Sequence, residues 1–210
     1  MKPLIAVIVS AALITGYLGT AHAAEKRLFY LHGCCIKGKH DPKAGEYETI
    51  VQKLKDSGLN VSFQLRTADI NDSNDQAMAY AAKIAEQVQD LLAKGTPPED
   101  ITVAGYSLGS RITLVASGLI ANPKVNFVLL AGCPIKQTIP IDYSRVKGRV
   151  LSIRDTKDDK FGSCDGRLPD GLTYKEIVLN SGEGHAVFRL SDEKYLKLWK
   201  EPLLNWTEGK

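Results

Sequence analysis

Apolar and polar positions along this chain follow two alternating periods. Some stretches are short apolar runs or alternate apolar with polar residues, a pattern typical of strands; they cover residues 27–31, 59–65, 101–104, 125–130, 149–153 and 174–179. Others place apolar residues three and four positions apart, the spacing of a helix with one buried face; they cover residues 45–57, 75–94, 108–121 and 191–206. Gly58 and Gly95 follow the first two helical stretches, where a glycine commonly ends a helix.

The regular alternation of these elements predicts an α/β fold. A strand, a helix and a second strand joined in this order favour right-handed crossovers between parallel strands. Residues 125–130 are almost entirely apolar, as expected for a central strand covered on both faces. We therefore expect a mostly parallel sheet of about six strands with helices on both faces. In such sheets, sites form beyond the carboxyl ends of the strands.

The first 23 residues are expected to be a signal peptide. Lys2 precedes a mostly apolar stretch over residues 4–18, and Ala21-His22-Ala23 fits the small-x-small cleavage rule. An uncleaved anchor is the alternative, but the apolar stretch is short for a span of about 20 residues. We expect cleavage after Ala23. Residues 24–210 would then form one domain, periplasmic or secreted from a bacterium, with no stable membrane anchor.

Charge and composition exclude one class of partner. Lysine and arginine number 27 against 24 acidic residues, a formal net charge of +3. No dense basic patch interleaved with aromatic residues occurs, so nucleic-acid binding is not indicated.

The cysteines Cys34, Cys35, Cys133 and Cys164 predict disulfides, because an even number in an exported chain is typical of bridges. A bridge between adjacent cysteines closes a strained ring. We therefore expect bridges from Cys34 and Cys35 to Cys133 and Cys164. Buried free thiols are the alternative. A zinc site is disfavoured, because no second Cys-x-x-Cys or nearby histidine supplies the ligand spacing.

The strongest chemical signal is Gly105-Tyr106-Ser107-Leu108-Gly109, placed between a predicted strand and a predicted helix. A serine hydroxyl is a poor nucleophile unless it is held exposed beside a base. A sharp strand-to-helix turn does this, and glycines are needed where flanking side chains would collide. The same turn aims the first N–H groups of the helix at the reacting centre.

A base and an acid are expected from other loops at the same sheet edge. Histidine is the natural base near neutral pH. His185 lies in a glycine-flanked turn after the last strand, whereas His32 follows the first strand directly, where its usual role is structural, and His40 lies in a polar loop. The acid is less decided. Asp155, Asp158 and Asp159 all follow the strand at 149–153, and Asp158 is favoured because a short turn normally precedes such a side chain.

Two backbone N–H groups are expected to form an oxyanion hole. One belongs to Leu108, the residue after Ser107, and the other belongs to Cys34, in the loop after His32-Gly33.

Taken together, these segments resemble the α/β-hydrolase superfamily over essentially all of residues 24–210. The matching segments are Leu31-His32-Gly33, Gly105-Tyr106-Ser107-Leu108-Gly109, Ile153-Arg154-Asp155-Thr156-Lys157-Asp158 and Gly184-His185. The order Ser, Asp, His is the one that family uses. The resemblance implies Ser107 as nucleophile, Asp158 as acid, His185 as base, and Leu108 with Cys34 as oxyanion donors. Asp155 stands where the family has a glycine, which keeps it as an alternative acid.

The resemblance also has two departures. The usual leading hairpin is missing, and only residues 134–148 separate Cys133 from the next strand, which leaves no room for a cap domain. We therefore expect an open site without a cap, suited to varied or bulky esters.

The sequence thus predicts an exported serine hydrolase of the carboxylesterase type that needs no metal or organic cofactor. Its substrate would be a small-molecule or lipid-like ester. The alternatives are an inactive binding or accessory protein on the same fold, and an acyltransferase or peptidase using the same three side chains.

Overall fold

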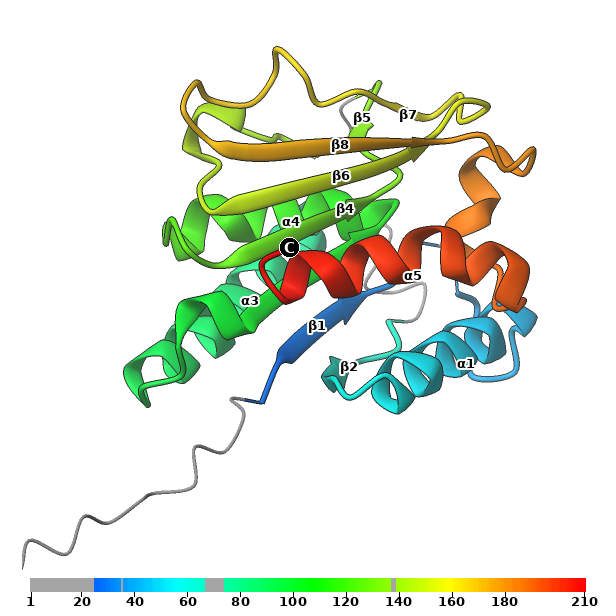
Figure 1. Ribbon diagram of the computed structural model, residues 1–210, viewed down its shortest axis with the longest axis horizontal. Helices are drawn as coiled ribbons and strands as arrows, with labels where there is room; N and C mark the ends of the chain where they lie inside the picture. The colour runs from blue at the N-terminus through cyan, green and yellow to red at the C-terminus, as the bar shows by residue number, and fades with distance from the viewer. Residues whose placement is uncertain (1–24, 35, 67–73, 137–138) are drawn as a thin grey trace, which may run out of the picture.

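The computed structural model describes residues 25–34, 36–66, 74–136 and 139–210 (Figure 1). Six strands form one sheet in the order β2-β1-β3-β4-β6-β8, and every neighbouring pair is parallel. The strands are β1 (Arg27–Leu31), β2 (Asn60–Phe63), β3 (Ile101–Tyr106), β4 (Asn126–Leu130), β6 (Arg149–Asp155) and β8 (Thr173–Leu179). The predicted parallel sheet is confirmed.

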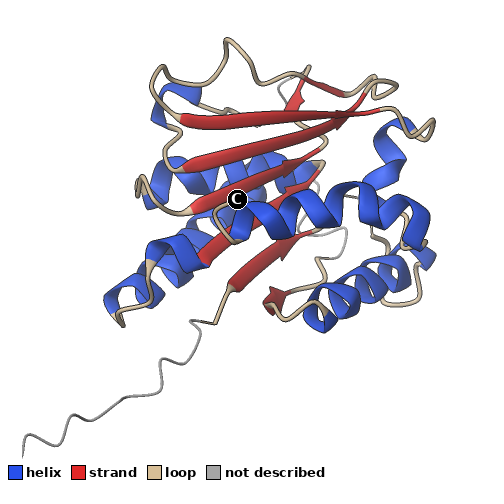
Figure 2. Cartoon of the chain, in the orientation of Figure 1, coloured by secondary structure: helices blue, strands red, loops and turns tan. Residues whose placement is uncertain are grey.

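Helices cover both faces of this sheet, as predicted (Figure 2). Helices α1 (Pro42–Asp56) and α5 (Glu193–Thr207) pack on one face, and α3 (Asn74–Ala93) and α4 (Leu108–Ile120) pack on the other. Successive strand residues point to opposite faces. Tyr30 therefore joins the core beneath α1 and α5, whereas Phe29 joins the core beneath α3 and α4.

Aspartates set the starts of the two helices on the first face. The side chain of Asp41 accepts a hydrogen bond from the backbone N–H of Lys43, and Pro42 occupies the first helical position of α1. Asp192 caps α5 in the same way through the N–H of Lys194. Such caps satisfy N–H groups that have no partner within the helix.

A second, two-stranded sheet lies beside the carboxyl ends of the main strands. Strand β5 (Cys133–Pro134) pairs antiparallel with β7 (Phe161–Gly162). This pairing sets Cys133 opposite Gly162, close to Cys164, and the two cysteines form a disulfide with their Cα atoms 5.1 Å apart. The predicted bridges from Cys34 and Cys35 to Cys133 and Cys164 are therefore wrong. Cys34 is itself disulfide-bonded, and Cys35 lies outside the described residues.

The connection from β5 to β6 is short. Its described residues contain one regular element, the 3-10 helix η2 (Tyr143–Arg145). No cap domain is inserted among them, which agrees with the expected open architecture.

The described chain starts and ends at the amino-terminal edge of the sheet. The Lys26 ammonium lies 2.5 Å from Asp100 Oδ1, just before β1 and β3 begin. Helix α5 runs back from the carboxyl edge to the amino edge (Figure 1).

The expected signal peptide, residues 1–23, lies outside the described residues. Within the described part of the chain, no helix is both long and apolar enough to cross a membrane.

Candidate active site

Three side chains from separate loops meet at the carboxyl edge of the sheet. Ser107 lies between β3 and α4, Asp158 follows β6, and His185 lies in the 3-10 helix η3 (Gly184–Arg189) after β8. The Nε2 atom of His185 lies 2.9 Å from the Ser107 Oγ atom, and its Nδ1 atom lies 2.7 Å from the Asp158 Oδ2 atom. The structure thus joins the predicted nucleophile, base and acid in one chain of hydrogen-bond contacts.

Ser107 occupies a strained backbone conformation, with φ 57° and ψ −112°. A Cβ atom on Gly105 would lie 2.1 Å from the Gly109 carbonyl oxygen, and one on Gly109 would lie 2.0 Å from the Leu31 carbonyl oxygen. Both glycines are therefore required by the close approach of β1, β3 and α4. The Ser107 side chain caps no backbone N–H of α4, so its hydroxyl points to His185 instead.

The two candidate acids have different environments. The side chain of Asp158 is fully buried, and its Oδ1 atom accepts hydrogen bonds from the N–H groups of Lys160 and Phe161. Its other oxygen is thereby aimed at His185. The two N–H donors hold the carboxylate of Asp158 in place.

Asp155 instead orders the surrounding loops. It accepts hydrogen bonds from the N–H of Lys157 and from both the N–H and the hydroxyl of Ser181. Burial opposes ionisation, but these hydrogen bonds outweigh it and lower the pKa of Asp155. Asp159 lines the cavity described below and is exposed. Of the three aspartates, Asp158 alone contacts the His185 ring in the structure.

Two aromatic rings hold the imidazole of His185. The Phe161 ring stacks on it with centroids 5.2 Å apart, and the Tyr106 ring lies at 5.1 Å. The Tyr106 hydroxyl also donates to the His185 carbonyl oxygen at 3.0 Å. Sequence reasoning assigned no role to either aromatic residue, although Tyr106 lies inside the motif around Ser107.

His32 and His40, the two other histidines considered as a base, have different surroundings. The buried His32 ring accepts a hydrogen bond at Nε2 from the Arg66 N–H and contacts the Gly33 carbonyl oxygen through Nδ1. Nδ1 must therefore carry the proton of a neutral ring. Burial, together with the nearby Arg66 guanidinium, lowers the pKa of His32 to about 3. His40 is exposed in the loop before α1.

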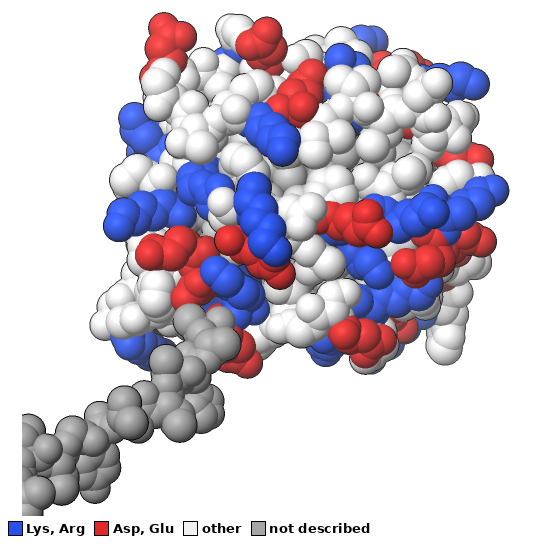
Figure 3. Space-filling model, viewed as in Figure 1, with Lys and Arg blue, Asp and Glu red and all other residues white. Residues whose placement is uncertain are grey.

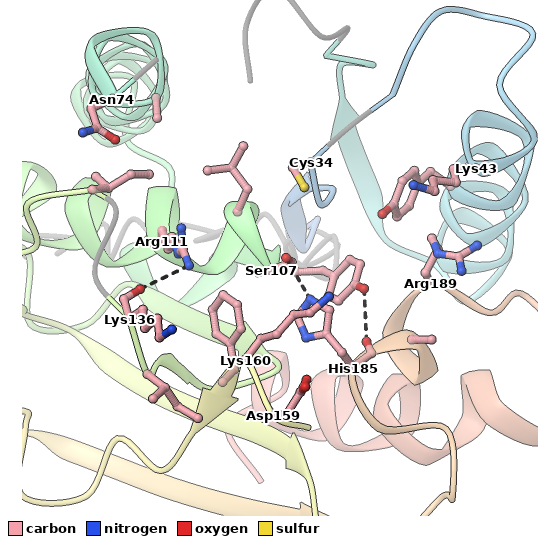
Figure 4. A pocket seen from close by; sticks show the side chains of 18 residues that line it. Cys34, Lys43, Asn74, Ser107, Arg111, Lys136, Asp159, Lys160, His185 and Arg189 are labelled. Atoms are coloured by element: carbon pink, nitrogen blue, oxygen red, sulfur yellow. Dashed lines mark hydrogen bonds between the residues drawn. The ribbon is translucent and has the colours of Figure 1, made fainter. Parts of the chain in front are cut away.

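A cavity of about 930 Å³ opens above Ser107 and His185 (Figure 4). Leu108 and Cys34, the expected oxyanion donors, both line it. Leu108 begins α4, where the N–H groups have no carbonyl partner within the helix. The cavity therefore combines a hydroxyl, an imidazole and a helix N-terminus, which is a set suited to acyl transfer.

Comparison with known proteins assigns the fold. No family model matches the sequence, and no curated protein sequence matches it. Solved structures match over most of the chain. SOBER1 from Arabidopsis thaliana is 18% identical with a TM-score of 0.57, covering 88% of this chain and 98% of its own. A phospholipase/carboxylesterase from Dyadobacter fermentans is 19% identical with a TM-score of 0.56, covering 87% of this chain and 91% of its own.

A third similar structure carries the superfamily in its name. It is a protein of the alpha/beta hydrolase superfamily from Xanthomonas campestris, 13% identical with a TM-score of 0.57, covering 88% of this chain and 98% of its own. This chain therefore has the α/β-hydrolase fold, as the resemblance implied.

Proposed function

We propose that this protein is an exported serine hydrolase of the carboxylesterase type. The observation that carries the proposal is the continuous contact from Asp158 Oδ2 to His185 Nδ1 at 2.7 Å and from His185 Nε2 to Ser107 Oγ at 2.9 Å. A nucleophile, a base and an orienting acid within hydrogen-bond reach are the geometric requirement for activating a serine.

The proposed reaction has two acyl-transfer steps. His185 takes the proton of Ser107 as the Oγ atom attacks the ester carbonyl carbon, and it returns that proton to the departing alcohol. Water then hydrolyses the acyl-serine with His185 again as base. Asp158 holds the Nδ1–H tautomer and stabilises the imidazolium, and the N–H groups of Leu108 and Cys34 stabilise the oxyanion.

Export of the protein belongs to the same proposal. Its support is the leader-like sequence of residues 1–23 together with the Cys133–Cys164 disulfide, because such bridges persist mainly in oxidising compartments. The substrate class is a small-molecule or lipid-like ester that enters the open cavity.

Replacing the nucleophile tests the proposal. Ser107→Ala should lower kcat for p-nitrophenyl butyrate by at least about 10³-fold, because the acyl-enzyme can no longer form. It should also abolish labelling by a fluorophosphonate probe. The matched control is Ser57→Ala, which removes an exposed hydroxyl at the end of α1.

Thermal unfolding of both variants shows whether the fold is kept. Turnover or labelling retained in a folded Ser107→Ala protein would refute the assignment. A wild-type protein that neither turns over esters nor reacts with the probe would favour the binding-protein alternative. A transferase would be favoured if the acyl group passed mainly to an added alcohol or amine that competes with water.

A further inference from the structure

The cavity above Ser107 is lined by charges of predominantly one sign. Among the described residues, its lining includes five basic residues and a single acidic residue, Asp159; the basic residues are Lys43, Arg111, Lys136, Lys160 and Arg189. The chain as a whole is nearly balanced, with 27 basic and 24 acidic residues. Figure 3 shows both signs intermixed over the face that it displays. The positive excess is therefore a local property of the cavity.

Within the described part of the chain, most of these positive charges form no ion pair. Among the described residues, no ion pair involves Lys43, Lys136, Lys160 or Arg189. Like charges that share a concave, partly enclosed surface repel one another, and the walls focus their field into the cavity. Such a cavity attracts anions and disfavours cations.

Arg111 has a different role from the other basic residues. Its guanidinium lies over the Phe161 ring at 5.3 Å, and its Nη2 atom donates to the Lys136 carbonyl oxygen at 3.3 Å. Arg111 therefore braces the wall formed by Phe161 and the loop at Lys136.

Lys43 and Arg189 form a pair on the opposite side of Ser107 from Arg111 (Figure 4). Lys43 lies in the first turn of α1, and Arg189 ends η3, the element that carries His185. The two elements are fastened together, because the Glu46 carboxylate of α1 accepts a hydrogen bond from the Ser191 N–H just after η3. The elements that carry these two basic residues are thus joined to each other at the wall of the cavity that contains Ser107 and His185.

We propose that Lys43 and Arg189 bind a negatively charged group of the ester that Ser107 attacks, and so select anionic esters. The inference rests on the proposed serine hydrolase activity and adds the substrate class. A guanidinium and an ammonium together offer several charged donors, which suits a carboxylate or phosphate oxygen cluster.

Matched aryl esters test this selectivity and locate the charge. 4-Acetoxybenzoate carries its carboxylate on the alcohol part, with methyl 4-acetoxybenzoate as the neutral counterpart. Phenyl 4-carboxybenzoate carries it on the acyl part, with phenyl 4-methylbenzoate as the neutral counterpart. Each kcat/KM is divided by the hydroxide-catalysed rate constant of the same ester, which removes differences in intrinsic reactivity. The anionic-to-neutral ratio should favour the anion in one pair, and that pair identifies the part of the ester that the basic residues contact.

Charge removal at the pair should reduce this ratio. In Lys43→Gln/Arg189→Gln we expect a fall of about tenfold, because two partly exposed charged contacts are lost. Arg189→Lys should keep most of the ratio, and Asp159→Asn should raise it. The control Lys55→Gln/Lys197→Gln removes the same net charge from exposed positions on α1 and α5 and should change the ratio by less than about twofold.

The possible results distinguish a failure of the proposed anion site from a failure of the proposed hydrolase activity. The anion site alone would be refuted if Ser107 turned over neutral esters and the anionic-to-neutral ratio were equal in the double variant and its control. A wild-type preference for the neutral member of both pairs would also refute it. Turnover of all four esters no faster than that of Ser107→Ala would instead refute the hydrolase activity itself.

Discussion

Asp155 and Asp158 show how three positions in the chain change the role of an identical side chain. Asp155 ends β6 and accepts hydrogen bonds from Ser181 and Lys157, so it fastens the loop after β8 to the loop after β6. Asp158 lies beyond the turn and contacts His185. The sequence alone does not decide which of the two is the acid that contacts His185, because the direction of each side chain depends on a turn that periodicity does not describe.

Isosteric substitutions should separate these two roles. Asp158→Asn should lower kcat by about 10³ to 10⁴-fold, because an amide no longer fixes the tautomer or stabilises the imidazolium. Asp155→Asn should lower kcat by less than about tenfold while reducing Tm, because its amide N–H₂ faces other donors. Ester kinetics and thermal unfolding of both variants measure the difference. A larger loss of kcat in Asp155→Asn would reverse the assignment.

His32 makes the stability of the protein depend on pH. Its pKa is about 3 in the folded protein against 6.5 when unperturbed. Below pH 6.5 the unfolded chain therefore binds a proton that the folded protein does not, so the free energy of unfolding falls as the pH decreases toward 3. The slope reaches at most about 1.4 kcal/mol per pH unit for one group.

The substitution His32→Asn should remove this slope between pH 6.5 and 5, a range above the ordinary pKa values of carboxylates. Urea unfolding at several pH values measures it, with His40→Asn as the control because His40 is exposed. An equal slope in wild type and His32→Asn would show that His32 does not bind a proton on unfolding.

The two shortest strands, β5 and β7, help to position the candidate acid, Asp158. Strands β5 and β7 contain two residues each, and the Cys133–Cys164 disulfide closes their pairing. Asp158 lies between β6 and β7, and the Ile135 N–H donates to the Lys160 carbonyl oxygen at 3.0 Å. The segment that carries the acid is therefore tied to the loop after β4.

Removing the bridge should weaken both the fold and the site. For Cys133→Ser/Cys164→Ser we expect the free energy of unfolding to fall by about 4 kcal/mol, because the bridge joins residues 31 positions apart. We also expect kcat/KM to fall, because the Asp158 segment loses one anchor. Denaturant unfolding and ester kinetics measure the two effects. Unchanged kcat/KM in the folded variant would show that hydrogen bonds alone position the acid.

Across the whole molecule, the features encoded by periodicity were predictable. Among the described residues, the six strands of the main sheet and the four long helices have regular spacings, and their alternation specifies the parallel sheet. The convergence of Ser107, Asp158 and His185 follows, because each comes after a strand and parallel strands share one carboxyl edge.

Features that depend on pairings between distant loops were not predictable. The pairing of β5 with β7 is too short to show a period, and the disulfide prediction was wrong because that pairing decides which cysteines meet. The basic lining was missed for a related reason. Lys43, Lys136 and Arg189 are single charges in separate segments, and only the fold gathers them.

The position of the chain ends also has a practical consequence. Because α5 returns to the amino edge of the sheet, a linker attached after Lys210 would leave the molecule on the side opposite Ser107 (Figure 1). Immobilising the protein on a resin through that linker would orient the cavity toward the surrounding solution, and bulky substrates could still reach it.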